Sequence, residues 1–454
     1  MSKTIAAISS GNAPGGIGII RISGADAIKI ASRVFKPFDN SDLTDLKGYR
    51  AKYGNIIIGG SKADNAVALV FRAPKSYTGE DVAELSVHGG LLAVQNTLQA
   101  VFDAGAAPAE AGEFTKRAFL NGKIDLTQAE SVASMISAQG QAELKASFNA
   151  LQGVLSREIN SVLEKLLDMS ALMAAWVDYP DEEIPELGSD ELEKTLSEAA
   201  EKLKKLLDNY DNGQTVTCGV NTVIAGRPNA GKSSLMNMLS KTEKSIVTHI
   251  EGTTRDIVED SVRLGDIVLH LKDTAGLRDS DDFVEAIGIE KAYRAIDDAQ
   301  LVLAVFDSSQ TISKEDLDLI EKCRGKNAVA VINKTDLKTE IDINTIKNAF
   351  SSVVFISAKL GDGYEELCDA VKDVLGIADF DSNAPLLANL RQKLNCERAH
   401  ESICAALDAL KVGMTFDAIN VMLDAAADEL LSLTGKKATT EVVNNIFSKF
   451  CVGK

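Results

Sequence analysis

The sequence contains no long hydrophobic run. No stretch approaches the roughly 18 apolar residues that a membrane-spanning helix needs. The first residues, Met1 to Ile8, also lack the apolar core of a secretory signal peptide. We therefore expect no membrane association and a cytoplasmic location.

Cysteine is sparse and unpaired in the sequence. None of the cysteines forms the C-x-x-C spacing of a zinc or redox motif, and their scatter does not resemble a disulfide framework. The cysteine pattern therefore favours a reducing compartment and indicates neither a zinc site nor a disulfide framework. The six cysteines are Cys218, Cys323, Cys368, Cys396, Cys404 and Cys451.

Positive charge is also in short supply. The chain has 48 Lys and Arg against 66 Asp and Glu, which gives a net charge of −18 at pH 7. Such a balance argues against tight, non-specific nucleic-acid binding by the whole chain, because phosphates are repelled. It still permits a local basic patch or a basic partner that holds RNA jointly. At 454 residues the chain predicts two to four domains.

Residues 1–121 are predicted to form a mixed α/β domain, from short apolar runs and two helical patterns. Two polar segments, Ser76–Asp81 and Gly112–Lys123, have no amphipathic period. Each is either a loop that lines a ligand or a well-capped surface turn. Strands are expected at Thr4–Ser9, Gly18–Ile22, Asn55–Ile58, Ala66–Phe71 and Val82–Val87, and helices at Ala25–Phe35 and Gly90–Ala104.

Helical patterns fill residues 122–214 and 377–454. Thr127-Gln-Ala-Glu130 reads as a capping box. The pattern then runs to about Val177, so a break is expected at Gly140 or Gly153, and Trp176 is expected in the core. A second helix is expected from Asp190 to Asn212-Gly213. After Pro385, helices are expected at Leu386–Leu410, Thr415–Thr434 and Thr440–Phe450.

Residues 215–376 alternate strand and helix, which predicts a parallel sheet flanked by helices. Leu264-Gly265-Asp266 joins two of the strands as a tight hairpin, so one edge pair is expected to be antiparallel. The helical sequence patterns on both sides of residues 215–376 predict one helical domain that is interrupted by this α/β domain. The expected strands are Thr222–Ala225, Ile257–Arg263, Ile267–Lys272, Leu301–Phe306, Ala328–Ile332 and Val353–Ile356.

The clearest motif is Gly226-Arg-Pro-Asn-Ala-Gly-Lys-Ser233, which follows an apolar strand and precedes a helix. This is the phosphate-loop pattern in its required setting. Its main-chain N–H groups cradle phosphates, Lys232 reaches the β- and γ-phosphates, and the Ser233 hydroxyl binds Mg²⁺.

Four further motifs follow in the order that a GTP-binding domain requires. Asp273-Thr-Ala-Gly276 ends an apolar strand; its Asp is expected to hold Mg²⁺ through water, and the Gly276 N–H to sense the γ-phosphate. Thr253 or Thr254 offers a second hydroxyl ligand to Mg²⁺. Asn333-Lys-Thr-Asp336 reads the guanine edge, and Ser357-Ala-Lys359 completes the base pocket. Five motifs in correct order and strand context predict GTP binding.

The catalytic residues follow a less usual pattern. A Ras-like enzyme places a water-orienting Gln after the Asp-x-x-Gly motif, whereas Leu277 stands there in this chain. An aliphatic side chain cannot orient water, so another polar group must do so. No arginine finger is assignable either, and the transition-state charge needs another cation.

Outside these motifs the residues resemble the MnmE (TrmE) family of tRNA-modifying GTPases, over essentially the full length. The resemblance is carried by six segments: Gly15–Gly24, Tyr77–Asp81, Gly112–Phe114, Arg117–Asn121, Tyr179–Glu183 and the terminal Cys451-Val-Gly-Lys454. It implies a multidomain α/β plus all-α fold, with an N-terminal α/β folate-binding domain and a helical domain interrupted by an inserted Ras-like P-loop G domain. The domains implied are 1–121 (folate binding and dimerisation), 122–214 (helical, first part), 215–376 (G domain) and 377–454 (helical, second part).

The resemblance also implies a function. Family members act with an FAD-dependent partner to install a carboxymethylaminomethyl or aminomethyl group on C5 of the wobble uridine (position 34) of certain tRNAs. A tetrahydrofolate derivative such as 5-formyltetrahydrofolate is thought to supply the one-carbon unit. The implied partners are a second copy of the chain, the FAD-dependent protein in a heterotetramer or larger complex, and tRNA. The matching folate positions are Arg21, Glu84, Lys123 and Lys454, with Cys451 in or near the one-carbon chemistry. A buried helical cysteine is the alternative for Cys451.

For GTP hydrolysis the resemblance implies that K⁺ replaces the arginine finger. Its ligands here would be Asn229, Thr248, Ile250 and Thr253, Mg²⁺ would be held by Ser233 and Thr254, and the matching catalytic acid is Glu285. The full set of expected GTP-binding residues is Asn229, Ala230, Gly231, Lys232, Ser233, Ser234, Thr248, His249, Ile250, Glu251, Gly252, Thr253, Thr254, Asp273, Thr274, Ala275, Gly276, Asn333, Lys334, Asp336, Ser357, Ala358 and Lys359.

Two other functions are alternatives, and the G domain by itself fits the first of them equally well. One is a GTP-dependent ribosome-assembly or RNA-binding switch, which predicts co-sedimentation with ribosomal subunits and normal wobble-uridine modification after deletion. The other is a folate-dependent transferase that uses GTP only as a structural ligand, which predicts negligible hydrolysis.

Overall fold

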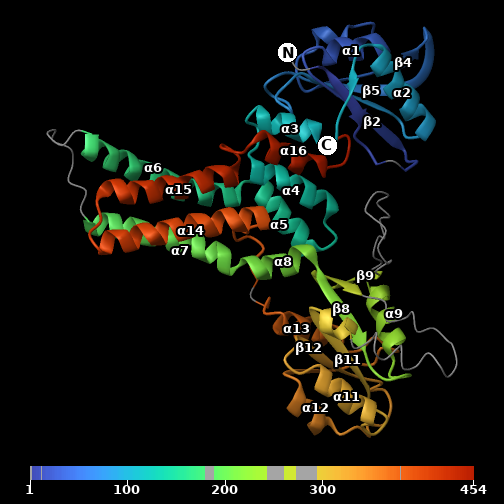
Figure 1. The fold of residues 1–454 in the computed structure, drawn as a ribbon. Coiled ribbons are helices and arrows are strands. Elements are labelled where there is room, and N and C mark those ends of the chain that lie inside the picture. The colour runs from blue at the N-terminus through green and yellow to red at the C-terminus, as the bar shows by residue number, and fades with distance from the viewer. Residues whose placement is uncertain (1–2, 12, 179–188, 243–259, 272–293, 379) are drawn as a thin grey trace. The chain divides into compact units, whose positions relative to one another are not determined.

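The computed structural model describes residues 3–11, 13–178, 189–242, 260–271, 294–378 and 380–454, whose helices and strands are drawn in Figure 1. These residues divide into two compact units. The first contains Met1–Ala133, Leu151–Ala199 and Arg398–Lys454, and the second contains Ser134–Ala150 and Ala200–Glu397. The predicted helical segments are therefore shared between the two units.

The first unit is built on a seven-stranded sheet in the order β3-β4-β5-β6-β2-β1-β7. Its neighbouring strands are antiparallel, except that β1 and β7 are parallel. The apolar faces of α1 (Ala27–Val34) and α2 (Leu91–Asp103) pack on the sheet and form its core. The strands are β1 (Ile5–Ile8), β2 (Ile17–Ser23), β3 (Phe35–Pro37), β4 (Arg50–Ile58), β5 (Ser61–Phe71), β6 (Val82–His88) and β7 (Ala107–Pro108).

Alternation of side chains explains why the strands in this sheet could be predicted. In β5, Ala66, Ala68 and Val70 are buried while the residues between them are more exposed, which is the period of two of a strand with one face in the core. All five predicted strands and both predicted helices are present, but β4 and β5 each begin five residues earlier than predicted, while the other bounds differ by at most two residues. β3 and β7 were not predicted, because three and two residues are too few to show a period.

Segment 112–123 differs from its prediction. The sequence indicated a loop or turn, but Glu113–Leu120 form the helix α3. Its buried face consists of Phe114, Thr115, Arg117 and Ala118. Two of these residues are polar, so the helical period is invisible to a pattern based on apolar residues.

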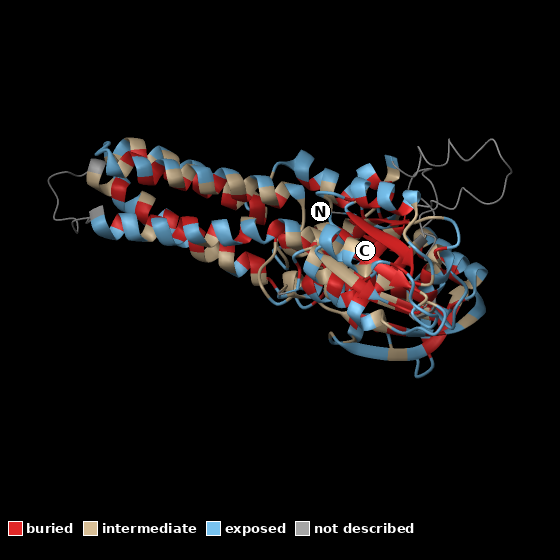
Figure 2. Ribbon diagram, turned by 90° about the horizontal axis from the view of Figure 1, so that it is seen from below, coloured by how far each residue is buried: buried red, intermediate tan, exposed pale blue. Residues whose placement is uncertain are grey.

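Helices form the remainder of the first unit and part of the second. The breaks expected at Gly140 or Gly153 occur at both positions, and α6 packs along α15. The long helices are banded by buried and exposed residues in Figure 2, as amphipathic helices are. Their bounds are α4 (Leu126–Ser137), α5 (Gln141–Leu151), α6 (Val154–Asp178), α7 (Ser189–Asp208), α8 (Tyr210–Cys218), α14 (Leu390–Lys411), α15 (Phe416–Thr434) and α16 (Thr440–Ser448).

Three local predictions in the helical segments were wrong. Trp176 is half-buried in α6 rather than in the core. Asp190 lies in the first turn of α7 and is not its cap. Asn212-Gly213 does not end a helix but lies inside α8, because the break falls earlier, after Asp208.

The capping box at the start of α4 also lies two residues earlier than predicted. The Asp125 carboxylate accepts a hydrogen bond from Gln128 N at 2.9 Å, and the Gln128 side chain accepts one from Asp125 N at 3.0 Å. The Thr127 hydroxyl instead donates to Asp125 at 2.7 Å. Asp125 and Gln128 therefore form the reciprocal pair that satisfies the first N–H groups of α4.

The second unit contains a six-stranded sheet in the order β13-β12-β11-β8-β10-β9. The strands are parallel except for the β9–β10 hairpin at one edge, as predicted. One face is covered by α9 (Lys232–Thr242) and α13 (Tyr364–Val374), and the other by α11 (Lys314–Lys322) and α12 (Ile343–Ala349). The strands are β8 (Val220–Ala225), β9 (Asp260–Leu264), β10 (Ile267–Leu271), β11 (Leu301–Asp307), β12 (Ala328–Asn333) and β13 (Ser352–Phe355).

Candidate functional sites

The phosphate loop lies between the end of β8 and the start of α9, in the strand–loop–helix order that the motif predicts. Gly231 has φ +99°, and a Cβ added to it would lie 2.1 Å from Nδ2 of Asn333. Only glycine therefore fits both the left-handed backbone and the close approach. The N-terminus of α9 begins at Lys232, so its free N–H groups face the loop.

Lys232 is held inside this loop. Its ammonium donates hydrogen bonds to the carbonyl oxygens of Gly226 at 2.7 Å and Arg227 at 2.9 Å. Burial lowers the pKa of Lys232, because the charged form loses water there. Ser233 and Ser234 follow on the first turn of α9 and are exposed. The loop is thus arranged around a partly desolvated cation, which suits an anionic ligand.

The predicted base-recognition residues meet the phosphate loop at the carboxyl end of β12. Nδ2 of Asn333 donates to the carbonyl of Ala230 at 3.2 Å, and its Oδ1 accepts from the N–H groups of Lys334 at 2.8 Å and Ala358 at 3.0 Å. Asn333 is 2% exposed, and its buried side chain links three segments of the chain through these hydrogen bonds. The sequence motifs around 230, 333 and 358 are therefore brought together.

The outer residues of the two base motifs are also linked. The Ser357 hydroxyl donates to Oδ1 of Asp336 at 2.8 Å. Asp336 and Lys359 are exposed, while Ser357 is buried. This arrangement leaves the Asp336 carboxylate at the surface with one oxygen already oriented, as a group that accepts N–H bonds from a ligand edge requires.

One residue of this site, Asp307, was not predicted from the sequence. It ends β11, is 2% exposed and binds the ammonium of Lys334 through Oδ2 at 2.6 Å. Burial acts to raise the pKa of Asp307, but hydrogen bonds from Lys334 and Ser309 outweigh it and hold that pKa below its ordinary value. A signal was available, because Asp307 directly follows the buried strand Leu301–Phe306 at the edge where the other motifs end.

A second candidate site lies in the first unit, around Arg21 on β2. Arg21 pairs across the strands with Glu84 on β6, and Nε donates to its carboxylate at 2.8 Å. The guanidinium carbon lies 5.5 Å from the ring centre of Tyr77 and 5.6 Å from that of Phe114. Burial raises the pKa of Tyr77, although its bond to the Thr115 hydroxyl and the charge of Arg21 oppose this. The site therefore combines a cation, an anion and two aromatic walls.

The C-terminal tail reaches the same site. Val452 forms a β-bridge with Ala111, and the N–H of Phe114 donates to the carbonyl of Lys454 at 3.2 Å. Lys454 is therefore joined to Arg21 through Phe114, whose N–H bonds to Lys454 and whose ring lies beside Arg21. Cys451 is exposed and lies beyond the end of α16, so the alternative prediction of a buried helical cysteine is wrong.

Lys123, the fourth predicted folate residue, contacts the 74–81 loop. Its ammonium donates to the carbonyl of Pro74 at 3.0 Å. A Cβ added to Gly79 would lie 3.4 Å from the Lys123 side chain, so Lys123 passes close to the backbone of Gly79. Lys123 is thus linked to the loop that carries Tyr77, and not directly to Arg21.

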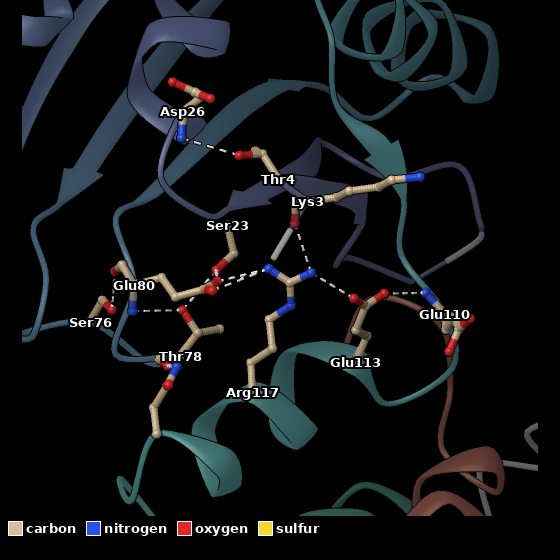
Figure 3. A network of polar contacts seen from close by, with 11 residues as sticks. Lys3, Thr4, Ser23, Asp26, Ser76, Thr78, Glu80, Glu110, Glu113 and Arg117 are labelled. Carbon is tan, nitrogen blue, oxygen red and sulfur yellow. Dashed lines mark hydrogen bonds and ion pairs between the residues drawn. The ribbon is translucent and has the colours of Figure 1, made fainter. Parts of the chain in front are cut away.

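A buried network fixes this loop against α3 (Figure 3). The Arg117 guanidinium donates to Glu80 at 2.9 Å, to Glu113 at 2.7 Å and to the carbonyl of Lys3 at 2.9 Å. Glu80 also accepts from the Ser23 hydroxyl at 2.8 Å. Such multidentate bonding requires the planar fork of arginine. It joins the two segments that carry the aromatic walls, which motif reasoning did not anticipate.

Comparisons with known proteins identify both the N-terminal domain and the helical domain. The family model of the GTP-binding protein TrmE N-terminus matches residues 4–123, and that of the MnmE helical domain matches residues 126–451. The tRNA modification GTPase MnmE of Clostridioides difficile is 39% identical over the full length of both chains. The protein of the same name from Symbiobacterium thermophilum is 40% identical over all of this chain and 99% of its own.

The chain belongs to the MnmE family of tRNA modification GTPases.

Several residues that the family resemblance singles out lie outside the described residues. These include three of the four K⁺ ligands, one Mg²⁺ ligand, the Asp-x-x-Gly motif and the catalytic acid. Their positions therefore stay predictions. They are Thr248, His249, Ile250, Glu251, Gly252, Thr253, Thr254, Asp273, Thr274, Ala275, Gly276 and Glu285.

Two features are absent from the described residues. No group of three or more His, Cys, Asp and Glu side chains that could hold a metal ion occurs among them. None of the helices described is long and apolar enough to cross a membrane.

Proposed function

We propose that this chain is a K⁺-dependent GTPase that modifies tRNA. With an FAD-dependent partner protein it adds a carboxymethylaminomethyl or aminomethyl group to C5 of the wobble uridine, using a one-carbon unit of tetrahydrofolate. The observation that carries the proposal is the presence of two sites in one chain. The second unit holds a phosphate loop that is bonded to the guanine motif, and the first unit holds the Arg21 site, which the C-terminal tail reaches.

The Arg21 site suits a reduced folate. Glu84 is a carboxylate that accepts N–H bonds of the kind a pterin ring offers, and Tyr77 and Phe114 present ring faces beside it. Arg21 is only 18% exposed, and its Nε lies 2.8 Å from the Glu84 carboxylate, so it fixes the position of that group. A bound tetrahydrofolate would supply the one-carbon unit, and these residues would orient it and exclude water. Cys451, which is exposed next to the tail residues, is a candidate for the chemistry itself.

Folate binding is tested by titrating the purified chain with 5-formyltetrahydrofolate. We expect Arg21→Ala to weaken binding about tenfold or more, because Glu84 loses its partner and the stacked cation is removed. Arg33→Ala is a matched control, since Arg33 is an exposed arginine on α1 of the same unit. A folded wild-type chain without folate affinity would overturn this part of the proposal.

The phosphate loop suits the proposed monovalent cation at Asn229. This residue has φ +61°, and it is exposed. Within the part of the chain that the structure describes, no hydrogen bond uses its side-chain amide, so its oxygen is available to a hard cation. We propose Asn229, Thr248, Ile250 and Thr253 as K⁺ ligands, Ser233 and Thr254 as Mg²⁺ ligands, and Glu285 as the residue that orients the attacking water.

The proposed cation and catalytic acid are tested by steady-state GTP hydrolysis. We expect K⁺ to stimulate hydrolysis strongly and Na⁺ to be a poor substitute, since an arginine finger, which the cation replaces, contributes roughly 10³–10⁵ in rate. Glu285→Ala is expected to slow hydrolysis greatly while the affinity for GTP stays close to that of the wild type. Equal rates in the two salts would rule out the K⁺ site.

The cellular role is tested by mass spectrometry of wobble uridines from cells that lack this chain. Loss of the C5 group supports the proposed function, and an unchanged uridine contradicts it.

We also propose that the chain acts in the cytoplasm as a homodimer through its N-terminal domain and forms a heterotetramer or larger complex with its partner. The proposed domains are 1–121, 122–214, 215–376 and 377–454.

A further inference from the structure

Asp307 is a buried carboxylate that the motifs of the nucleotide site do not include. It is the last residue of β11 and lies opposite Asn333 in the parallel register of β11 and β12. One of its oxygens, Oδ1, accepts hydrogen bonds from the N–H of Ser309 at 3.0 Å and from its hydroxyl at 2.7 Å. The other, Oδ2, lies 2.6 Å from the ammonium of Lys334. The carboxylate therefore closes a turn with one oxygen and anchors a cation with the other.

The anchored cation reaches the phosphate loop. The ammonium of Lys334 also donates to the carbonyl oxygen of Asn229 at 2.8 Å. Both Lys334 and Asn229 have left-handed backbones, with φ +66° and +61°. Residues other than glycine adopt this conformation at a cost, and the surroundings must hold them in it. One ammonium thus joins two strained residues, and Asp307 fixes where that ammonium lies.

The main chain of Lys334 is fixed from the same direction. The Ser308 hydroxyl donates to the carbonyl of Lys334 at 2.8 Å, and the N–H of Ser308 donates to the carbonyl of Asn333 at 2.9 Å. Ser308 therefore holds the main chain at Lys334, and Asp307 holds the ammonium at the end of its side chain. A lysine without these contacts retains many rotamers, and ordering them costs free energy each time that a ligand binds.

We propose that Asp307 is a positioning residue of the GTPase site, which acts through Lys334 on the backbone of Asn229. Its second effect is electrostatic and rests on the proposed function. The side chain of Asn229 is the proposed K⁺ ligand, while its carbonyl already faces a lysine ammonium. The Asp307 carboxylate neutralises that ammonium, so that a second cation binds at the same residue against less repulsion.

The test replaces the charge and keeps the shape. Asp307→Asn retains an oxygen for the two Ser309 bonds but loses the charge that holds Lys334. Asp297→Asn is the matched control, because Asp297 pairs with Lys326 at 2.9 Å but is 59% exposed. Ser309→Ala is a second variant, which removes one bond from the turn and keeps the charge. Thermal unfolding without nucleotide shows whether each variant folds.

Two binding readouts decide the role of Asp307. The first is the affinity for a fluorescent GDP analogue, which we expect Asp307→Asn to weaken by about tenfold, with little change in Asp297→Asn and a smaller change in Ser309→Ala. The second is the K⁺ concentration that half-saturates the complex with GDP and aluminium fluoride. We expect it to rise several-fold in Asp307→Asn only.

Wild-type values for both readouts in a folded Asp307→Asn protein would overturn the proposal. Equal losses in Asp307→Asn and Ser309→Ala would also overturn it, because the turn and not the charge would then be responsible. If the wild-type chain shows no dependence on K⁺, the K⁺ site of the proposed function fails by itself. The affinity for GDP then decides the positioning role of Asp307.

Discussion

At the scale of the residue, the fold gives the six cysteines very different chemistry. Cys218 and Cys451 are exposed, Cys404 is half-buried, and Cys323, Cys368 and Cys396 are buried. Burial raises the pKa of Cys396 to about 12 and that of Cys323 to about 11, because a thiolate there would lose its water. The thiolate is the reactive form of cysteine, so these two side chains are protected twice, by access and by protonation.

We therefore predict a two-phase reaction with a thiol reagent at pH 8. Cys218 and Cys451 react first, whereas Cys323 and Cys396 react only after the chain unfolds. Cys451→Ser is expected to remove one fast equivalent, and a fast phase of undiminished amplitude in that variant would refute the assignment.

The raised pKa values of Cys323 and Cys396 also predict that the stability of the folded chain falls as pH rises from about 9, because the unfolded chain releases these protons first.

At the scale of the element, helix α4 shows how a cap is chosen. Two overlapping patterns are present, Asp125-x-x-Gln128 and Thr127-x-x-Glu130, and both satisfy the capping-box rule. The structure uses the first, since the Thr127 hydroxyl lies within 2.7 Å of both Asp125 and the Ser156 hydroxyl on α6. Packing against α6 therefore buries Thr127 and leaves Asp125 to begin the helix.

Asp125→Ala is predicted to destabilise the start of α4 by about 1 kcal/mol, the usual cost of losing an N-cap carboxylate. Hydrogen exchange of the amides in the first turn of α4 measures this locally, without requiring the whole chain to unfold in one step. Amides near the middle of α15 serve as the internal control. Unchanged exchange in the first turn would show that Asp125 does not cap the helix.

At the scale of the whole molecule, the two candidate sites lie in different compact units. The tail enters the site of the first unit through Gly453, which has φ +98°. A Cβ added to it would lie 2.0 Å from the carbonyl oxygen of Ile8, and the Ser9 hydroxyl donates to the Gly453 carbonyl at 2.9 Å. The tail therefore fits only with glycine at this position.

Gly453→Ala is predicted to displace the tail and to weaken binding of 5-formyltetrahydrofolate about tenfold, while the affinity for GDP stays unchanged. Gly413→Ala is a matched control, because Gly413 also has a positive φ (+73°) but a Cβ there meets open space. Both affinities are measured by titration of the same preparations. A parallel loss of GDP affinity would contradict the independence of the two sites.

The sequence by itself determined the elements and motifs that are local in the chain. The phosphate loop, the longer strands of both sheets and the breaks at Gly140 and Gly153 follow from short-range rules of period, glycine placement and turn chemistry. The same rules failed at α3, whose buried face includes Arg117, because a buried charge looks like a surface residue until its partners are known.

Only the tertiary structure decided which residues meet. Arg117 binds Glu80, which lies 37 positions away in the chain, Phe114 joins Arg21 to the C-terminal tail, and Asp307 holds Lys334 against Asn229. No short pattern encodes such contacts, because they depend on the order of the strands in the sheets and on the course of the chain between them. The sequence therefore specified the motifs, and the tertiary structure decided how the residues between them hold those motifs in place.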